Sequence, residues 1–175
     1  MRVGATSPDE VLPAGEEGEI IADLAGDEAF SGYWRRPEAD EKALRDGWYF
    51  TSDMGYLDEE GDLFVTGRVD DLIITGGENV SPAEIENVLS LHPQVEEVVV
   101  AGLPDEQWGQ IVTAFVKVRD ELDENALNDH CSEAGLARFK RPRRYIFVED
   151  IPKSAVGKVL RRVLVSYRAD SLPAD

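Results

Sequence analysis

Lys158 is the residue whose type and position best suit chemistry. It lies in a short loop before the last amphipathic segment, within the run Pro152-Lys153-Ser154-Ala155-Val156-Gly157-Lys158. A long cationic side chain beside a glycine can reach into a neighbouring site and neutralise phosphate charge there. The alternative is a solvated surface lysine, which is the commoner case when this loop is considered alone.

Asp53, Arg68 and Trp108 are further candidates, each with a structural alternative. The two carboxylate oxygens of Asp53 can accept hydrogen bonds from a vicinal diol such as that of a ribose, or can cap an Asx-type turn. Arg68, at the end of a predicted strand, can bind a nucleotide or pair with one of the many acids. Trp108 lies in a polar setting that suits stacking, although most such tryptophans pack on their own domain.

A glycine pair, Gly76 and Gly77, interrupts the middle of the chain. The apolar run 72–74 before it predicts a strand buried on both faces. The run 81–84 after it, Ser-Pro-Ala-Glu, predicts an N-cap, a first-turn proline and a capping-box acid. A glycine-rich turn that leads into a helix N-terminus can receive an anion, or it can be a tight structural turn.

Size and composition narrow the class of protein. A chain of 175 residues with 42% hydrophobic residues is not wholly disordered. It has neither an apolar run long enough for a transmembrane helix nor the hydrophobic core of a signal peptide, so we expect a cytoplasmic protein. The single Cys131 excludes an internal disulfide, and the spacing of Cys and His predicts no metal site. No Ser/His/Asp or Cys/His nucleophilic arrangement is recognisable, and His92 and His130 are expected to be structural or exposed.

The charge is unevenly distributed. The net charge of −18 argues against nucleic-acid binding. Residues 1–137 carry 8 Lys/Arg against 32 Asp/Glu, whereas residues 138–168 carry 10 Lys/Arg against 2 Asp/Glu. This basic segment either docks on the acidic part of the chain or receives a polyanionic small molecule such as a nucleotide or coenzyme.

The pattern of apolar and turn residues along the chain predicts an α+β fold in two parts. Residues 1–69 are mostly β, with a polar helix over 37–45 and separate strands at 48–51 and 54–57. From residue 70 onward, three strands alternate with helices. A small three-stranded sheet (95–101, 111–118 and 145–148) should be covered by helices at 81–91, 123–134 and 158–168. The change of character near Asp70-Asp71 places the domain boundary there, giving domains 1–69 and 70–175.

Taken together, these segments resemble the adenylate-forming superfamily of acyl- and aryl-CoA ligases, peptide-synthetase adenylation domains and beetle luciferases. Several linked motifs in order are far more specific than any one of them. The matching runs are Tyr49-Phe50-Thr51-Ser52-Asp53, Gly67-Arg68-Val69-Asp70, Gly76-Gly77-Glu78-Asn79-Val80-Ser81-Pro82 with Glu84-Ile85-Glu86, Phe139-Lys140-Arg141-Pro142, and Pro152-Lys153 through Gly157-Lys158 to Arg161-Arg162.

The resemblance implies an AMP-forming acid–thiol ligase that works in two steps. A carboxylic acid attacks ATP to give an acyl-adenylate and pyrophosphate, and the thiol of coenzyme A then displaces AMP. On the family pattern Asp53 would hold the ribose hydroxyls with help from Arg68. Lys158 would bridge the carboxylate and the α-phosphate. Mg²⁺ would be held mainly by a large N-terminal AMP-binding domain.

The same resemblance assigns the second half-reaction to the region after residue 69. Asp70 would be the hinge about which the C-terminal domain rotates between the two steps. Gly76 and Gly77 would then line the tunnel for the pantetheine arm. The weaker proposals for contact with coenzyme A are Trp108, Phe139 and Arg141.

Departures from the family pattern refine the comparison. The loop Gly-Gly-Glu-Asn-Val-Ser-Pro is similar to that of the CoA ligases rather than the peptide synthetases. Ser52 replaces the usual glycine, Phe50 replaces a common basic residue, and Ile74 stands where many relatives have lysine. Ser52 and Ile74 are also features of aryl-CoA ligases, which hints at an aromatic acid.

The family's phosphate loop and acid pocket have no counterpart in the sequence. Residues 1–69 are therefore expected to be the last β-rich subdomain of the N-terminal domain, and residues 70–175 the mobile C-terminal domain. We expect that the isolated chain does not adenylate an acid. It would be a truncated gene product, an engineered fragment or half of a split enzyme. The alternatives are an adenylation domain that loads a carrier protein and a non-catalytic acidic interaction module.

Overall fold

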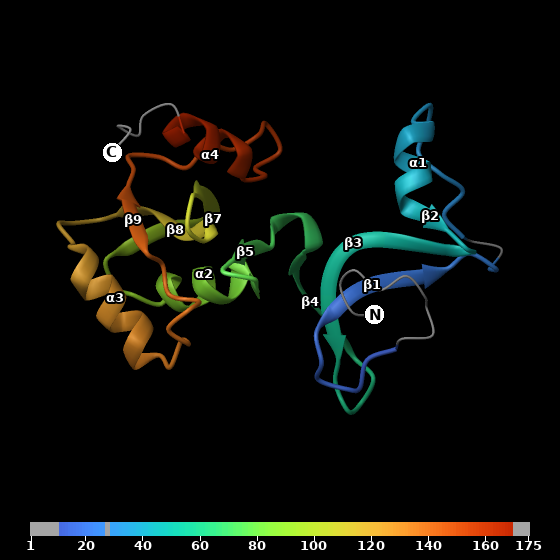
Figure 1. The fold of residues 1–175 in the computed structure, drawn as a ribbon, viewed down its shortest axis with the longest axis horizontal. Coiled ribbons are helices and arrows are strands. Elements are labelled where there is room, and N and C mark those ends of the chain that lie inside the picture. Colours follow the sequence, from blue (N-terminus) through green and yellow to red (C-terminus); the bar gives the residue numbers. More distant parts are fainter. Residues whose placement is uncertain (1–10, 27–28, 170–175) are drawn as a thin grey trace. The chain divides into compact units, whose positions relative to one another are not determined.

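The computed structural model describes residues 11–26 and 29–169, which divide into two compact units between Asp70 and Asp71. Figure 1 labels their elements along the chain. The N-terminal unit ends at Asp70 and the C-terminal unit begins at Asp71. Together they form the predicted mixed α+β fold, with largely antiparallel sheets and few helices.

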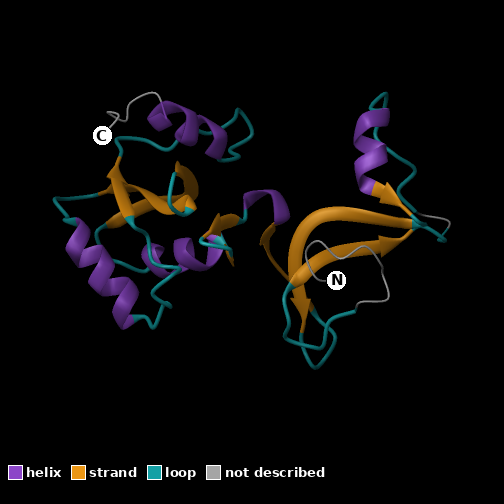
Figure 2. Cartoon of the chain, viewed as in Figure 1, coloured by secondary structure: helices purple, strands orange, loops and turns teal. Residues whose placement is uncertain are grey.

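The N-terminal unit is a four-stranded antiparallel sheet with one short helix (Figure 2). β3 (Trp48–Leu57) lies at its centre, paired with its three neighbours: β1 (Gly18–Asp23), β2 (Leu44–Arg45) and β4 (Leu63–Arg68). Helix α1 (Pro37–Ala43) begins at its proline, as predicted, because the fixed φ of proline suits the first helical position.

The strands predicted at 48–51 and 54–57 are wrong as separate elements, because β3 runs through both of them. Ser52 continues the strand with a φ of 60°, a left-handed conformation that costs a non-glycine residue about 1 kcal/mol or more. The backbone N–H of Ser52 donates to Glu19 Oε1 at 3.2 Å. The pairing of β1 with β3 shifts register between Glu19 and Ile21. The strand is therefore irregular immediately before Asp53.

The C-terminal unit holds a five-stranded sheet rather than the predicted three strands. The three predicted strands are present as β7 (Val95–Asp105), β8 (Gly109–Val118) and β9 (Arg144–Phe147). The short β5 (Ile73–Thr75) and β6 (Glu78–Val80) join them, because β5 pairs with the start of β8. β9 pairs with β8 in parallel, whereas β7 and β8 form a long antiparallel hairpin. β7 therefore lies at an edge of the sheet.

Helices cover both faces of this sheet (Figure 1). α2 (Pro82–Ser90) and α3 (Glu124–Glu133) pack on one face over a core that includes Ile85, Leu89, Val100, Leu127 and Cys131. α4 (Arg161–Ala169) packs on the other face, where its Leu164 joins a core with Val99, Leu103, Phe115 and Ile151. The alternation of buried residues along β7 divides the two cores. The last helix begins three residues later than predicted, so Lys158 precedes it.

The N-terminus of α3 has a side-chain capping hydrogen bond, whereas that of α2 has none. Asp123 caps α3, accepting a hydrogen bond from Ala126 N at 2.9 Å, and Gly135 ends that helix region with a φ of 78°. Ser81 occupies the N-cap of α2, but its side chain makes no capping hydrogen bond. The predicted capping box is wrong, because the Glu84 carboxylate instead accepts two hydrogen bonds from Lys140 Nζ, at 2.7 and 2.8 Å.

Within the described residues, no helix combines the length and the apolar character needed to cross a membrane.

Candidate functional site

Asp53 and Arg68 form an ion pair across neighbouring strands of the N-terminal unit. Asp53 on β3 lies directly opposite Arg68 on β4, and Arg68 Nη1 donates to Asp53 Oδ1 at 2.8 Å. The side chains are 41% and 49% exposed, so the pair remains open to a ligand and is worth little to stability by itself. Asp53 Oδ2 retains its capacity to accept hydrogen bonds from a diol.

The backbone before Asp53 is held by a hydroxyl that sequence reasoning did not single out. Thr51 Oγ1 accepts a hydrogen bond from Asp53 N at 3.0 Å and donates to Ile20 O on β1 at 2.8 Å. This bridge closes the irregular turn of β3 at Ser52. The Asp53 carboxylate therefore projects from a restrained backbone, which suits a binding group.

Tyr49 and Tyr33 lie near this pair. Their hydroxyl oxygens are 3.2 Å apart, and Phe30 packs on both rings. The hydrogen bond with Tyr33, together with partial burial, raises the pKa of Tyr49 above its ordinary value. Tyr49 is therefore a neutral hydrogen-bonding group at physiological pH.

Asp70 and Asp71 lie in a single 3-10 turn, η1 (Val69–Asp71). The Asp70 side chain is 71% exposed and its Oδ2 lies 4.0 Å from Arg68 Nη2. The Asp71 side chain is 34% exposed, and its Oδ2 lies 3.5 Å from Arg161 Nη1 in the C-terminal unit. Each of the two neighbouring acids thus contacts an arginine of its own unit.

Gly76 and Gly77 form the turn of a β-hairpin, which corrects two expectations. Both have positive φ, 59° and 87°, and Thr75 pairs with Glu78, so the turn joins β5 to β6 rather than leading directly into a helix. β5 is not buried on both faces, because Ile73 is buried whereas Ile74 is 57% exposed.

Trp108 packs against this hairpin rather than standing free. Gly76 N donates to Trp108 O at 2.9 Å, and a Cβ on Gly76 would come within 2.8 Å of the indole ring. The guanidinium of Arg143 lies over the indole ring, with its Cζ 4.2 Å from the ring centroid. Sequence reasoning missed Arg143, although its position in the basic segment and an isolated tryptophan upstream were both visible.

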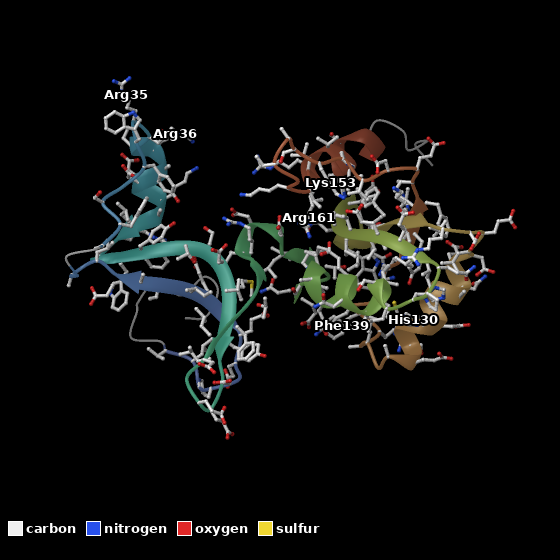
Figure 3. The ribbon with its side chains drawn as sticks, turned by 180° about the vertical axis from the view of Figure 1, so that it is seen from behind. Arg35, Arg36, His130, Phe139, Lys153 and Arg161 are labelled. Atoms are coloured by element: carbon white, nitrogen blue, oxygen red, sulfur yellow. The ribbon has the colours of Figure 1, made fainter. Side chains whose placement is uncertain are left out.

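Phe139 and Arg141 belong to the segment after α3. Phe139 is 44% exposed, and Figure 3 shows it on the side of the unit that also carries His130. Arg141 Nε donates to Leu136 O at 2.8 Å, which fixes the base of its guanidinium. Phe139 thus presents an accessible ring, whereas Arg141 is partly buried.

Lys158 lies at the end of a closed loop. Ser154 N donates to Lys158 O at 2.8 Å, Lys158 N donates to Ser154 Oγ at 3.1 Å, and Gly157 completes the turn with a φ of 81°. Lys153 and Val159 form a β-bridge at its base. The loop backbone is therefore restrained, while the Lys158 side chain is exposed.

The lysines of the C-terminal unit differ in their partners. Lys117, Lys140 and Lys153 each form an ion pair, with Glu96, Glu84 and Glu97 respectively. Within residues 29–169, Lys158 makes no ion pair within 4 Å. Its ammonium group is therefore available to an external anion.

The structure brings the candidates together in groups within each unit. Asp53, Arg68 and Asp70 cluster in the N-terminal unit, and Gly76 lies against Trp108 in the C-terminal unit. The described residues contain no group of three or more His, Cys, Asp or Glu side chains arranged to hold a metal ion.

A hollow of about 320 Å³ beside β1 is separate from these groups. It lies within the N-terminal unit, and residues of β1 and β3 line it, including Ile20, Ile21 and Tyr56. None of the candidate site residues lines it. The candidate ligand contacts therefore lie on surfaces and loops rather than in this hollow.

Comparisons with known proteins agree with these motifs. Residues 84–158 match the family model for the AMP-binding enzyme C-terminal domain. The chain is 48% identical over 161 residues to a 4-chlorobenzoate–CoA ligase of Arthrobacter, covering 92% of this chain and 31% of that protein. It is 51% identical over 151 residues to a 2-succinylbenzoate–CoA ligase of Geobacillus kaustophilus, covering 85% and 30%.

A solved structure gives the same relationship. The o-succinylbenzoate CoA synthetase of Bacillus subtilis, in complex with its acyl-adenylate intermediate, superposes with a TM-score of 0.80 at 39% identity. The match covers 90% of this chain and 32% of that one. The chain thus spans about a third of the length of the relatives it matches. Residues 84–158 thus match the AMP-binding enzyme C-terminal domain, and most of the chain is similar to about a third of the length of acyl- and aryl-CoA ligases.

Proposed function

We propose that this chain supplies the C-terminal part of an ATP-dependent carboxylic acid–CoA ligase. In the first step a carboxylate oxygen of the acid bonds to the α-phosphorus of ATP, and pyrophosphate leaves. In the second step the thiol of coenzyme A loses its proton to solvent, its sulfur bonds to the acyl carbon, and the acyl–oxygen bond to AMP breaks. With the proton released to solvent, no further reactant is needed.

The observation that carries this proposal is the exposed Lys158 side chain on a restrained loop, which forms no ion pair among the residues that the structure describes. A cation held without a competing carboxylate can meet the negative charge that builds up between the acid and the α-phosphate. The three other lysines of the same unit are neutralised by glutamates, so they are poorly suited to this role. Lys158 is therefore assigned to the first step.

Asp53 and Arg68 suit the nucleotide. The Asp53 carboxylate would accept hydrogen bonds from both ribose hydroxyls, while Arg68 fixes its orientation through Oδ1. The relative in complex with an acyl-adenylate supports an adenine nucleotide as the ligand of this pair. Asp70, beside Arg68, is proposed as the hinge between the two steps.

The thiol side is proposed on the hairpin of Gly76 and Gly77, which would line the path of the pantetheine arm. Trp108, Phe139 and Arg141 are the proposed contacts of the coenzyme A nucleotide, with the accessible ring of Phe139 available for stacking. Mg²⁺ is proposed to bind ATP with ligands from the N-terminal AMP-binding domain. The two named relatives are CoA ligases, which favours free coenzyme A over a carrier protein as the acceptor.

A chimera tests the proposal. Residues 18–168 of this chain would replace the corresponding segment of the Arthrobacter 4-chlorobenzoate–CoA ligase, to which the chain is 48% identical. We expect ATP–pyrophosphate exchange with 4-chlorobenzoate by the chimera and none by the isolated chain. A folded chimera without exchange, or robust exchange by the isolated chain, would contradict the proposal.

A further inference from the structure

Arg161, the first residue of α4, joins four elements of the C-terminal unit. Its Nη2 donates to both carboxylate oxygens of Glu86 on α2, at 2.8 and 2.9 Å. Its Nη1 lies 3.5 Å from Asp71 Oδ2 in η1. Glu86 Oε1 also accepts a hydrogen bond from Val100 N on β7, at 2.8 Å. One guanidinium therefore links α4, α2, η1 and the edge of the sheet.

The geometry of this link is a clasp around the sheet edge. α2 and α4 pack on opposite faces of the sheet, and β7 is the edge strand between them. An edge strand presents backbone N–H groups that lack a strand partner, and Glu86 satisfies the one at Val100. Figure 3 shows Arg161 on the same side of the unit as Lys153, at the base of the Lys158 loop.

The ion pair between Arg161 and Glu86 is partly buried. The side chains of Arg161 and Glu86 are 27% and 19% exposed. Removing one partner of a hydrogen-bonded ion pair leaves the other charge without compensation, at a cost that grows with burial. The contact between Arg161 Nη1 and Asp71 Oδ2 is weaker, because 3.5 Å is long for a hydrogen bond. The Nε of Arg161 is buried and has no acceptor among the described residues.

The clasp adjoins the Lys158 loop and the turn η1. Lys158 lies three residues before Arg161, and Leu160 N donates to Pro152 O at 2.9 Å, so the loop closes directly onto the clasp. Asp71 is the neighbour of the proposed hinge residue Asp70. A change in the orientation of Arg161 would therefore reach the Lys158 loop through the chain and the hinge through the weak Asp71 contact.

We propose that Arg161 is a positioning residue: through the two hydrogen bonds from its Nη2 to the Glu86 carboxylate it fixes the loop of Lys158 to the sheet edge for the adenylation step. This inference rests on the proposed function for its consequence, but not for its structural basis. The short hydrogen bonds to Glu86 keep the loop in place, whereas the longer contact with Asp71 allows the segment at the proposed hinge to move. Arg161 itself need not touch a substrate.

Amide hydrogen exchange on the full 175-residue chain tests the structural basis. The variant is Arg161→Met, and Arg162→Met is its matched control, because Arg162 is the adjacent, exposed arginine. We expect Arg161→Met to speed exchange at Val100 and across residues 154–160 by about tenfold or more, with α3 unchanged. Glu86→Gln should speed exchange at the same loop.

Two outcomes of this experiment would overturn the proposal. Exchange across residues 154–160 that matches the Arg162→Met control would show that the clasp does not hold the loop. An equal acceleration throughout the unit, α3 included, would make Arg161 a general stability residue. Arg161→Lys serves as the milder variant, because an ammonium keeps the charge and can donate to both carboxylate oxygens, as Lys140 does to Glu84, but lacks a second nitrogen to reach Asp71. It should accelerate loop exchange less than Arg161→Met.

The ligase chimera tests the consequence. Arg161→Met should lower ATP–pyrophosphate exchange by about tenfold or more, while thioester formation from supplied acyl-adenylate and coenzyme A stays within about twofold. An equal loss in both half-reactions would contradict a positioning role. If the unmutated chimera fails to adenylate, the proposed function fails, and the exchange result on the chain still decides whether the clasp exists.

Discussion

The backbone N–H of Gly76 donates to the carbonyl of Trp108, and the indole ring of Trp108 covers the position where a Gly76 side chain would begin. This contact fixes the β5–β6 hairpin to the turn between β7 and β8. The two residues were both predicted to contact coenzyme A. The structure shows that they also depend on one another, so a change at either alters the shape of the hairpin.

Gly76→Ala should destabilise the C-terminal unit more than Gly77→Ala. Both glycines have positive φ, so both variants incur backbone strain of about 1 kcal/mol. Only at Gly76 would the new methyl group meet the Trp108 ring, at 2.8 Å, which adds about 1–3 kcal/mol. Urea unfolding of the two variants measures this difference, and equal midpoints would contradict the packing of Trp108 on the hairpin.

Ser52→Gly should stabilise the N-terminal unit by about 1 kcal/mol, because glycine adopts the φ of 60° without strain. The hydrogen bond from the residue 52 backbone to Glu19 is retained in this variant. Ser52→Val should destabilise it, since a β-branched side chain is least compatible with that conformation. Thermal unfolding of the three proteins gives the order, and a lower midpoint for Ser52→Gly would contradict it.

Stability should fall as the pH drops below about 6.5. Burial lowers the pKa of His92 from its ordinary value of 6.5, and the charge of His130 lowers it further. The centroids of the two imidazole rings are 5.2 Å apart. The unfolded chain then binds more protons than the folded chain in this range, so the free energy of unfolding rises with pH until His92 is neutral in both states. His92→Asn should make the loss between pH 7 and 5 shallower. An unchanged slope would exclude His92 as its source.

Asp53→Asn should weaken AMP binding to the ligase chimera by about tenfold or more. The substitution removes the negative charge that both receives ribose hydroxyls and holds Arg68. Asp62→Asn is the control, since it removes the same charge from the turn between β3 and β4. Calorimetry with AMP separates the two variants, and equal affinities would remove Asp53 from the nucleotide site.

Local patterns predicted much of the fold. The periodicity of apolar residues located α2, α3 and the strands β7, β8 and β9, and Asp123 and Gly135 marked the ends of α3 correctly. The strained Ser52 was not predicted, because β-strand pairing can impose a conformation that propensity disfavours. The capping box at Glu84 failed for a similar reason, since Lys140, 56 residues away, takes the carboxylate.

The candidate site was predicted as motifs rather than as an arrangement. The pairing of Asp53 with Arg68 follows from the register of β3 and β4, which alternation alone does not give. The clasp of Arg161 and Glu86 depends on two helices on opposite faces of one sheet. No local signal in either segment indicates such a contact, because it spans 75 residues of sequence.

ATP–pyrophosphate exchange by the ligase chimera, with and without Lys158→Ala, shows whether Lys158 serves the adenylation step. Lys158 is exposed, so its truncation should leave the unfolding midpoint unchanged. We expect the variant to lose exchange by about a hundredfold or more, while thioester formation from supplied acyl-adenylate remains. A folded Lys158→Ala chimera that exchanges pyrophosphate at the unmutated rate would contradict the assignment of Lys158 to adenylation.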